Sequence, residues 1–277
     1  MKIIRKTKEL KNLLDSISNS SWSIGLVLTM GNIHEGHLSL IREAKNNNKF
    51  VITSIFINPT QFNNNDDYNL YPKTLDQDIL KLKSSNCDLL YLPSVDEIYP
   101  NGLIKERSIL KYRNILCDVS RPGHFDGVTT VVNTFFNLIK PKNSYFGEKD
   151  FQQMKLIDEM VRIKKLNINI IPCSSVRDKN GMSLSSRNSN FSLDQSEIFE
   201  KLGKKILLLV ESLKQKNLKV NFNEFKKELS KININKIDYL EIRDENSLEI
   251  TNNFNNARLF IAIYIDNTRI IDNFKLY

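Results

Sequence analysis

Short, continuously apolar runs alternate with segments of helical periodicity along most of the chain. Apolar runs bounded by turn residues are typical of strands that are buried on both faces of a parallel sheet. They predict strands at 23–28, 50–57, 88–92, 144–146 and 168–173. The segments around them predict helices at 7–18, 34–45, 74–85, 127–139 and 150–165. This alternation indicates βαβ units, and therefore an α/β fold built on a parallel sheet.

The helix predicted over 127–139 has the clearest apolar stripe. Its apolar residues recur at spacings of three and four, which is the period of one helix face. They are Val128, Val131, Val132, Phe135, Phe136 and Ile139. In the helix that follows, Asp150 stands at the first position, where its carboxylate is expected to cap free N–H groups.

The composition changes near residue 175. All seven prolines lie at or before Pro172, and the last glycine is Gly203. The later part of the chain predicts helices at 194–216 and 222–231 and strands near 237–243, 258–265 and 268–275. We therefore predict two domains, namely residues 1–175 with the parallel sheet and residues 176–277 as a smaller α+β unit.

The overall composition is that of a globular protein with a basic excess. Hydrophobic residues make up 40% of the 277 positions, and no apolar run approaches the length of a membrane span. The basic N-terminus lacks the apolar segment of a signal peptide, so we expect a cytoplasmic protein without a membrane partner. The net charge of +8 is spread along the chain, whereas nucleic-acid-binding proteins usually gather it into a stripe or tail. We expect no nucleic-acid partner and an attraction for small anionic substrates.

The three cysteines, Cys87, Cys117 and Cys173, are far apart and form no CxxC pair. This spacing argues against a disulfide framework and against a zinc site. We expect buried or incidental thiols and assign none of them as a nucleophile.

Histidine is the most informative residue type. Two of the three histidines, His34 and His37, lie in the sequence HEGH between a predicted strand and a predicted helix. Residues at i and i+3 share a helix face, so both imidazoles are expected to point the same way. Free N–H groups at a helix N-terminus favour phosphate, and Gly31 and Gly36 would let a nucleotide approach the backbone. Two structural histidines are the alternative, and neither a GxGxxG nor a Walker A sequence is present.

Polar residues at the ends of two other predicted strands are candidates for substrate binding. Ligands of open α/β sheets bind at the carboxyl ends of strands, where Asn58 and Gln61 could hydrogen-bond a small acid. A turn capped by the Asn58 side chain is the alternative. After a later strand, Lys149 would contact phosphate and Gln153 would read the hydroxyl and carboxylate of the acid. The alternative there is a surface turn with a solvated lysine.

A fourth cluster lies at the predicted domain boundary. Ser185, Ser186 and Arg187 offer a compact set of donors, and a guanidinium suits phosphate oxygens. We expect a loop that closes over a nucleotide, with a hydrophilic linker as the alternative. None of the four clusters places a nucleophile beside a base. This fits direct attack by a substrate carboxylate on an α-phosphate, with the protein supplying positioning and charge stabilisation.

Together these segments resemble the signature of the pantothenate synthetase family. The similarity keeps its order and spacing from about residue 23 to 190, and the combination is far more specific than any one segment. The segments that carry it are Thr29–Leu40 (TMGNIHEGHLSL), Ser54–Phe62 (SIFINPTQF), Tyr71–Thr74 (YPKT), Gly123–Val128 (GHFDGV), Phe146–Gln153 (FGEKDFQQ) and Ser185–Asn188 (SSRN).

The resemblance implies both a fold and a reaction. The fold would be a Rossmann-like nucleotidyltransferase domain with a small C-terminal α+β lid domain, usually in a homodimer. The reaction would join pantoate to β-alanine with ATP and Mg²⁺, through a pantoyl-adenylate, and would release AMP and pyrophosphate. The product, pantothenate, belongs to coenzyme A biosynthesis.

The resemblance also implies site residues. Gln61 and Gln153 would hold pantoate, Gln61 would also lie near β-alanine, and Asn58 is a further expected substrate contact. Asp78, with Asp76 nearby, is expected to bind the metal. His37 would be the proton donor, and His34, Lys149, Ser185, Ser186 and Arg187 would bind or stabilise the phosphates. ATP would contact Met30, Gly31, Asn32, Ile33, His34, Glu35, Gly36, His37, Gly147, Glu148, Lys149, Asp150, Val176, Leu184, Ser185, Ser186 and Arg187.

Three positions depart from the family pattern. Leu28 stands where proline is usual, and Asn63 stands where glycine is common, which is expected to alter the stiffness of two loops. Gln77 stands where a second carboxylate often neighbours Asp78, which weakens the expected metal site.

Two alternatives remain. One is another nucleotidyltransferase of the same fold, against which the acid-binding glutamines argue. The other is a nucleic-acid-binding protein with concentrated charge and exposed aromatic residues.

Overall fold

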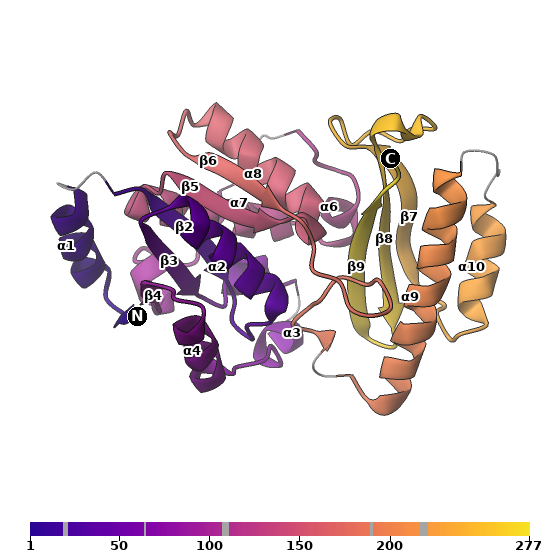
Figure 1. Ribbon diagram of the computed structural model, residues 1–277, viewed down its shortest axis with the longest axis horizontal. Helices are drawn as coiled ribbons and strands as arrows, with labels where there is room; N and C mark the ends of the chain where they lie inside the picture. The colour runs from indigo at the N-terminus through magenta and orange to yellow at the C-terminus, as the bar shows by residue number, and fades with distance from the viewer. Residues whose placement is uncertain (19–21, 64, 107–110, 189–190, 216–220) are drawn as a thin grey trace. The chain divides into compact units, whose positions relative to one another are not determined.

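The computed structural model describes residues 1–18, 22–63, 65–106, 111–188, 191–215 and 221–277. These residues form two compact units, Met1–Ser174 and Ser175–Tyr277. The first unit contains a six-stranded sheet and the second a three-stranded sheet (Figure 1). The predicted fold class is confirmed, because a parallel α/β unit is followed by a smaller α+β unit.

The sheet of the first unit is parallel, with the strand order β1-β4-β3-β2-β5-β6. Its strands are β1 (Lys2–Ile4), β2 (Ile24–Thr29), β3 (Phe50–Ile55), β4 (Leu89–Tyr91), β5 (Asn143–Gly147) and β6 (Asn169–Cys173). At its centre, Leu26 pairs with Ile52 on one side and with Ser144 on the other. All three side chains are fully buried, which explains why the strands read as unbroken apolar runs.

Helices cover both faces of this sheet. The helices of this unit are α1 (Thr7–Ser18), α2 (Glu35–Asn47), α3 (Asn65–Asn69), α4 (Leu75–Ser84), α5 (Val95–Ile98), α6 (Cys117–Ser120), α7 (His124–Ile139) and α8 (Phe151–Ile163), with the 3-10 turns η1 (Pro59–Gln61) and η2 (Glu148–Asp150). On one face, Ile41 of α2 packs into a core with Val27 and Leu90. Tyr91 follows Leu90 in its strand, so it points to the opposite face, where it meets Phe135 of α7.

The strand order reverses beside β2. β3 lies on one side of β2, and β5, which comes much later in the chain, lies on the other. In open α/β sheets, ligands bind outside the carboxyl ends of the strands at such a switch point. The chain leaves β2 into residues 30–37 and leaves β5 into residues 148–150. The topology therefore brings two of the predicted phosphate clusters to one edge of the sheet.

The second unit pairs two helices with an antiparallel sheet. Its elements are α9 (Leu193–Lys214), α10 (Phe222–Ser230), β7 (Ile237–Asp244), η4 (Phe254–Asn256), β8 (Ala257–Ile265) and β9 (Thr268–Lys275). Leu202 and Ile206 of α9 share a buried core with Leu259 and Ile261 of β8. The end of the predicted helix 194–216 falls at position 216, which lies outside the described residues.

Two of the differences from the prediction concern the starts of helices. Asp150 makes no side-chain hydrogen bond to α8, so its predicted role as a helix cap is wrong. The reason is that residues 148–150 already form η2, which runs directly into the helix. The predicted helix at 127–139 begins earlier, at His124, because Gly123 adopts the left-handed conformation that sets its start.

Candidate active site

The turn after β2 is closed by its two histidines. His34 is the N-cap of α2, and its Nδ1 accepts the N–H of Gly36 at 3.1 Å. His37 reaches back, and its Nδ1 accepts the N–H of His34 at 3.3 Å. The ring centroids lie 4.1 Å apart. The pair forms a reciprocal capping box, with imidazoles in place of the usual hydroxyl and carboxylate. The rings therefore lie together, although His34 precedes the helix.

These caps determine where each imidazole carries its hydrogen. A backbone N–H can only donate, so each Nδ1 must be the bare nitrogen and each Nε2 must carry the hydrogen. Burial, followed by the charges of Lys149 and Lys81, lowers the pKa of His34 to about 4. Burial, followed by His34 and the same lysines, lowers the pKa of His37 to about 3. Both rings are therefore neutral at physiological pH and present Nε2–H donors.

Glycine is required at two positions of this turn. Gly31 has a φ of +87°, and Asn32 follows it with a φ of 49°, so two consecutive residues are left-handed. A Cβ on Gly36 would lie 2.8 Å from Cε1 of His34, so only glycine lets that ring fold back over the backbone. Sequence alone predicted that both glycines admit a nucleotide, and the structure shows that the turn itself needs them.

Lys149 supplies a cation from the β5 side of the switch point. Its side chain is about one-fifth exposed (21%), and its Nζ lies 3.8 Å from a carboxylate oxygen of Asp150. Its charge contributes to the lowered pKa of both His34 and His37, so it lies within electrostatic reach of the two rings. The fold thus gathers the predicted clusters after β2 and β5 into one candidate anion site.

Helix α4 contacts the same turn through two residues. The buried carboxylate of Asp78 accepts the N–H groups of Asn32, at 2.9 Å, and Ile33, at 2.7 Å, and the hydroxyl of Thr74. The Nζ of Lys81 donates to the carbonyl of Ile33 at 2.6 Å. Lys81 was not predicted. Its spacing of three from Asp78 places both on one helix face, which is the signal that could have indicated it.

The expected metal site at Asp78 does not fit this geometry. Both of its carboxylate oxygens already accept hydrogen bonds, and Asp76 is exposed. Within the described ranges, no three or more His, Cys, Asp or Glu side chains are grouped so as to hold a metal ion. A Mg²⁺ ion held by the protein alone would need several oxygen ligands in near-octahedral arrangement. In this structure, Asp78 is an acceptor for backbone amides.

The turn after β3 is capped by Asn58, which is the alternative that the sequence left open. Its Oδ1 accepts from Thr60 and from the hydroxyl of Tyr99. Its Nδ2 donates to Oε1 of Gln61 and to the carbonyl of Gly127, each at 3.1 Å. The side chain is buried and its amide is fully engaged. The predicted contact between Asn58 and substrate is therefore corrected to a role in orienting Gln61.

Gln61 is fixed through both its side chain and its backbone. Its Nε2 lies 2.8 Å from Sδ of Met30. Its carbonyl accepts from Nδ1 of His124 at 2.7 Å and from the guanidinium of Arg121 at 3.3 Å. Arg121 also contacts Nε2 of His124 at 3.0 Å, so that nitrogen accepts and Nδ1 carries the hydrogen. The third histidine is a support for Gln61, a role that the sequence did not indicate, although His124 lies in a segment that carries the family resemblance.

Two adjacent glutamines of α8 have different surroundings. Gln152 is buried, accepts the N–H of Cys117 and donates to the carbonyls of Tyr112 and Ile115. Gln153 is partly exposed, and its side chain forms no hydrogen bond with any residue in the part of the chain that the structure describes. Gln153, rather than Gln152, therefore has a side-chain amide available for a ligand.

The fourth predicted cluster lies in the second unit. Asp272 of β9 is buried and accepts from Arg177 at 3.0 Å, from the N–H of Ser183 at 2.8 Å and from its hydroxyl at 2.6 Å. Beyond this anchor, the hydroxyl of Ser185 accepts the N–H of Arg187 at 3.3 Å. Asp272 was not predicted, because nothing in the sequence around a strand aspartate indicates which loop it holds.

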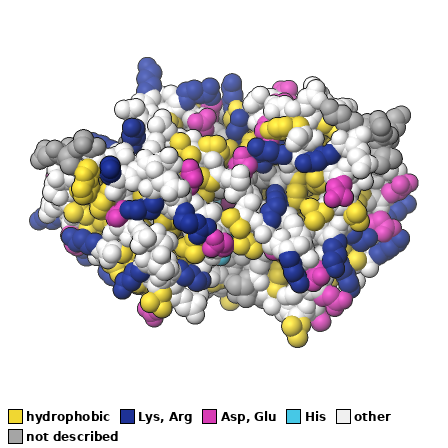
Figure 2. Space-filling model, in the orientation of Figure 1, with side chains coloured by type: hydrophobic (Ala, Val, Ile, Leu, Met, Phe, Trp, Pro, Cys, Tyr) yellow, Lys and Arg dark blue, Asp and Glu magenta, His cyan; other side chains and the backbone are white. Residues whose placement is uncertain are grey.

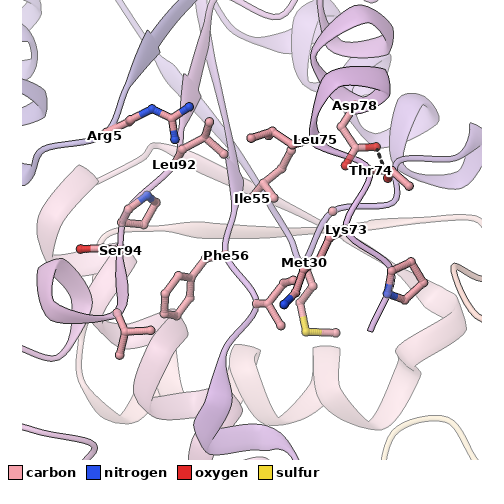
Figure 3. A pocket seen from close by; sticks show the side chains of 15 residues that line it. Arg5, Met30, Ile55, Phe56, Lys73, Thr74, Leu75, Asp78, Leu92 and Ser94 are labelled. Carbon is pink, nitrogen blue, oxygen red and sulfur yellow. Dashed lines mark hydrogen bonds between the residues drawn. The ribbon is translucent and has the colours of Figure 1, made fainter. Parts of the chain in front are cut away.

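A cavity of about 350 Å³ lies at the carboxyl ends of β2, β3 and β4 (Figure 3). Apolar side chains of β3 and the segment after β4 line it, together with the cationic side chains of Arg5 and Lys73. Among the predicted site residues, Met30, Gly31 and Asp78 line this cavity. It therefore borders the turn of residues 30–37, which we call the histidine turn, on the side where α4 contacts it.

The surface charge is mixed. On the face drawn in Figure 2, Lys and Arg side chains are interspersed with Asp and Glu. Among the described residues, we find no helix with the length and apolar character needed to cross a membrane. The candidate site described above lies at the switch point. There, neutral Nε2–H donors, a lysine and a helix N-terminus suit the stabilisation of negative charge on phosphate.

Comparison with known sequences gives a family match over nearly the whole chain. Residues 2–275 match the family described as Pantoate-beta-alanine ligase. The pantothenate synthetase of Thermosipho africanus is 40% identical over 276 residues, which cover 99% of each chain. The pantothenate synthetase of Clostridium botulinum is 38% identical over 277 residues, again 99% of each.

Solved structures agree with the sequence comparison. The pantoate-beta-alanine ligase of Francisella tularensis, complexed with β-γ ATP and β-alanine, is 39% identical with a TM-score of 0.87, covering 100% of this chain and 98% of that one. The pantothenate synthetase of Thermus thermophilus is 32% identical with a TM-score of 0.89 and full coverage of both chains (100%). A family match of this extent, carried by sequence and fold alike, shows that the chain belongs to the pantoate–β-alanine ligase family.

Proposed function

We propose that the protein joins pantoate to β-alanine with ATP, in two steps. In the first step, a carboxylate oxygen of pantoate attacks the α-phosphorus of ATP, and the bond from that phosphorus to pyrophosphate breaks. In the second step, the amine of β-alanine attacks the acyl carbon of the pantoyl-adenylate. The acyl C–O bond breaks, AMP leaves, and the amine gives up a proton as the amide of pantothenate forms.

The observation that carries this proposal is the pair of neutral imidazoles beside Lys149 at the switch point. The Nε2–H groups of His34 and His37 would donate to phosphate oxygens, and Lys149 would neutralise charge that grows on the leaving pyrophosphate. Donors that are fixed before the reaction stabilise such charge without reorganisation. Because each Nδ1 is engaged in the capping box, neither ring has to turn before it can donate.

The acid would bind beside the nucleotide through Gln61 and Gln153. The contact between Gln61 and Met30 supports this arrangement, since Met30 belongs to the turn that would hold ATP. The available amide of Gln153 supports it from α8. Gln61 would also contact β-alanine, while Asn58 would act through Gln61.

The remaining expectations are proposed on the family resemblance. They are ATP contacts from Val176 and from residues 184–187, a homodimer in the cytoplasm, and Mg²⁺ as part of the reaction. We propose that Mg²⁺ enters with ATP and is held mainly by phosphate oxygens and water, because this small cation readily keeps such ligands. Sedimentation of the purified protein would test the dimer.

The experiment that tests the function measures product formation with each combination of substrates. With ATP and pantoate alone, we expect about one equivalent of pyrophosphate per site in a single turnover, and no free AMP. Addition of β-alanine should start continuous release of AMP and pantothenate. As a control, pantoate is replaced by an acid of similar size without hydroxyl groups. Release of pyrophosphate without pantoate, or formation of ADP, would contradict the proposal.

A further inference from the structure

The backbone conformation of the histidine turn is stabilised largely by hydrogen bonds from outside the turn. Gly31 and Asn32 are both left-handed, and a non-glycine residue in that conformation persists only where its surroundings fix it. Within the turn, the N–H of Gly31 donates to the hydroxyl of Thr29 at 3.2 Å. The next two amides point instead to helix α4. The conformation of this turn therefore depends on a helix that contributes none of the expected phosphate donors.

Two side chains of helix α4 hydrogen-bond to the backbone of residues 32 and 33: Asp78 accepts N–H groups, and Lys81 donates to a carbonyl. The two oxygens of Asp78 each accept one amide, so the carboxylate determines the orientation of both peptide planes. Asp78 is 1% exposed, so water does not compete for these bonds. Lys81, one turn later, donates to the carbonyl of Ile33. The next residue is His34, whose own amide belongs to the capping box.

We propose that Asp78 and Lys81 are positioning residues for the nucleotide, which fix the backbone of residues 32 and 33 and so aim the His34–His37 pair. The inference rests on the proposed function for the identity of its ligand. Lys81, together with Lys149 of η2, also adds positive charge near both imidazoles, while Asp150 opposes these cations at His34. Positive charge in this place favours both the neutral form of the rings and the binding of polyphosphate.

The test uses the full chain and four variants. Lys81→Met removes the charge and the donor but keeps most of the aliphatic stem, and Lys81→Arg restores both. Asp78→Asn leaves one acceptor for two amides. Lys83→Met, which changes an exposed lysine on the same helix, is the matched control. Two quantities are measured for each. One is ATP affinity by calorimetry, and the other is the titration midpoints of His34 and His37 by NMR.

We expect Lys81→Met to weaken ATP binding by about tenfold to a hundredfold, the range for losing a hydrogen bond to a charged group. The titration midpoints of both imidazoles should rise in the same variant. Lys81→Arg should restore most of the affinity and keep the midpoints low, and Lys83→Met should match the unmodified protein in both. Asp78→Asn should weaken ATP binding and speed hydrogen exchange at the amide of Asn32 or Ile33.

A purely structural role gives a different result. If Lys81→Met lowers only the melting temperature, while ATP affinity and both imidazole midpoints of the folded protein stay unchanged, the proposal is overturned. If the unmodified protein binds no ATP, the proposed function fails. In that case the NMR readouts still decide whether α4 determines the geometry of the turn, since they need no ligand.

Discussion

His34 and His37 cap each other, since the Nδ1 of His37 accepts the N–H of His34 while the Nδ1 of His34 accepts an amide one residue before His37. This relationship gives one short sequence two tasks. The capping box begins α2, and the same hydrogen bonds leave both Nε2–H groups as the donors that we propose for a phosphate. On this proposal, the structural and the functional roles of these histidines are compatible.

The protonation of the two rings is the first prediction. We expect neutral Nε2–H tautomers in ¹⁵N spectra, with titration midpoints of about 4 for His34 and about 3 for His37. Both values are lowered from 6.5, so the unfolded chain binds protons that the folded chain does not as the pH falls below 6.5. The free energy of unfolding should therefore be fully retained above pH 6.5 and should decrease from there toward pH 4. Midpoints near 6.5 in the folded protein would contradict this interpretation.

The second prediction separates the cap from the donor at His37. In His37→Asn, the side-chain oxygen can replace Nδ1 as the acceptor for the amide of His34, but nothing replaces the Nε2–H. We expect a melting temperature near that of the unmodified protein and an adenylation rate reduced by about a hundredfold, which corresponds to about 3 kcal/mol of lost transition-state stabilisation. His37→Ala should lose both properties. A single-turnover pyrophosphate assay checks the rate, and full activity in His37→Asn would remove the donor role.

The third prediction concerns His124 and the acid. His124→Leu removes a donor to the carbonyl of Gln61, whereas His124→Asn can keep one. Because Arg121 also donates to that carbonyl, we expect a moderate effect, about fivefold to tenfold on the KM for pantoate in His124→Leu. ATP affinity should not change, and His124→Asn should recover part of the loss. Equal losses for ATP and pantoate would show that His124 acts on the fold instead.

The fourth prediction tests the anchor in the second unit. Asp272→Ala removes the acceptor that Arg177 and Ser183 share. The partly buried guanidinium of Arg177 then loses its carboxylate partner. We expect the free energy of unfolding to fall by about 3 kcal/mol, as for the loss of one partner of a buried ion pair. Urea denaturation is the measurement. Glu197→Ala, at an exposed ion pair with Lys201, is the control and should leave the urea midpoint unchanged.

Sequence reasoning succeeded where the signal is periodic. The continuous apolar runs predicted the inner strands, because each of these strands is buried on both faces. The helical segments between the runs predicted the helices that connect the strands, and hence a parallel sheet. β1 was missed because its apolar residues, Ile3 and Ile4, lie between charged residues and form no longer run, whereas the equally short β4 lies within the apolar run after Asp88. The stripe of α7 was visible because its apolar positions recur over about three turns, whereas its start depended on the backbone conformation of Gly123.

The candidate site was predictable only in part, for a physical reason. Turn residues such as His34 and Lys149 stand at strand ends, which sequence can locate. The residues that hold these turns in place are distant in the sequence. Asp78, for example, accepts amides that lie 45 and 46 positions earlier in the chain. The sequence placed an acid at Asp78 but could not distinguish an acceptor for amides from a metal ligand. Asn58 shows the same limit, because a cap and a substrate contact need the same side chain.

The most direct test of the central claim follows oxygen from the acid to the nucleotide. Pantoate labelled with ¹⁸O in its carboxylate is turned over with ATP and β-alanine, and the AMP is analysed by mass spectrometry and ³¹P NMR. The proposed adenylate predicts one ¹⁸O atom in the phosphate of each AMP, because the carboxylate oxygen that attacks phosphorus leaves with it. AMP without label, or label transferred to inorganic phosphate, would contradict the account.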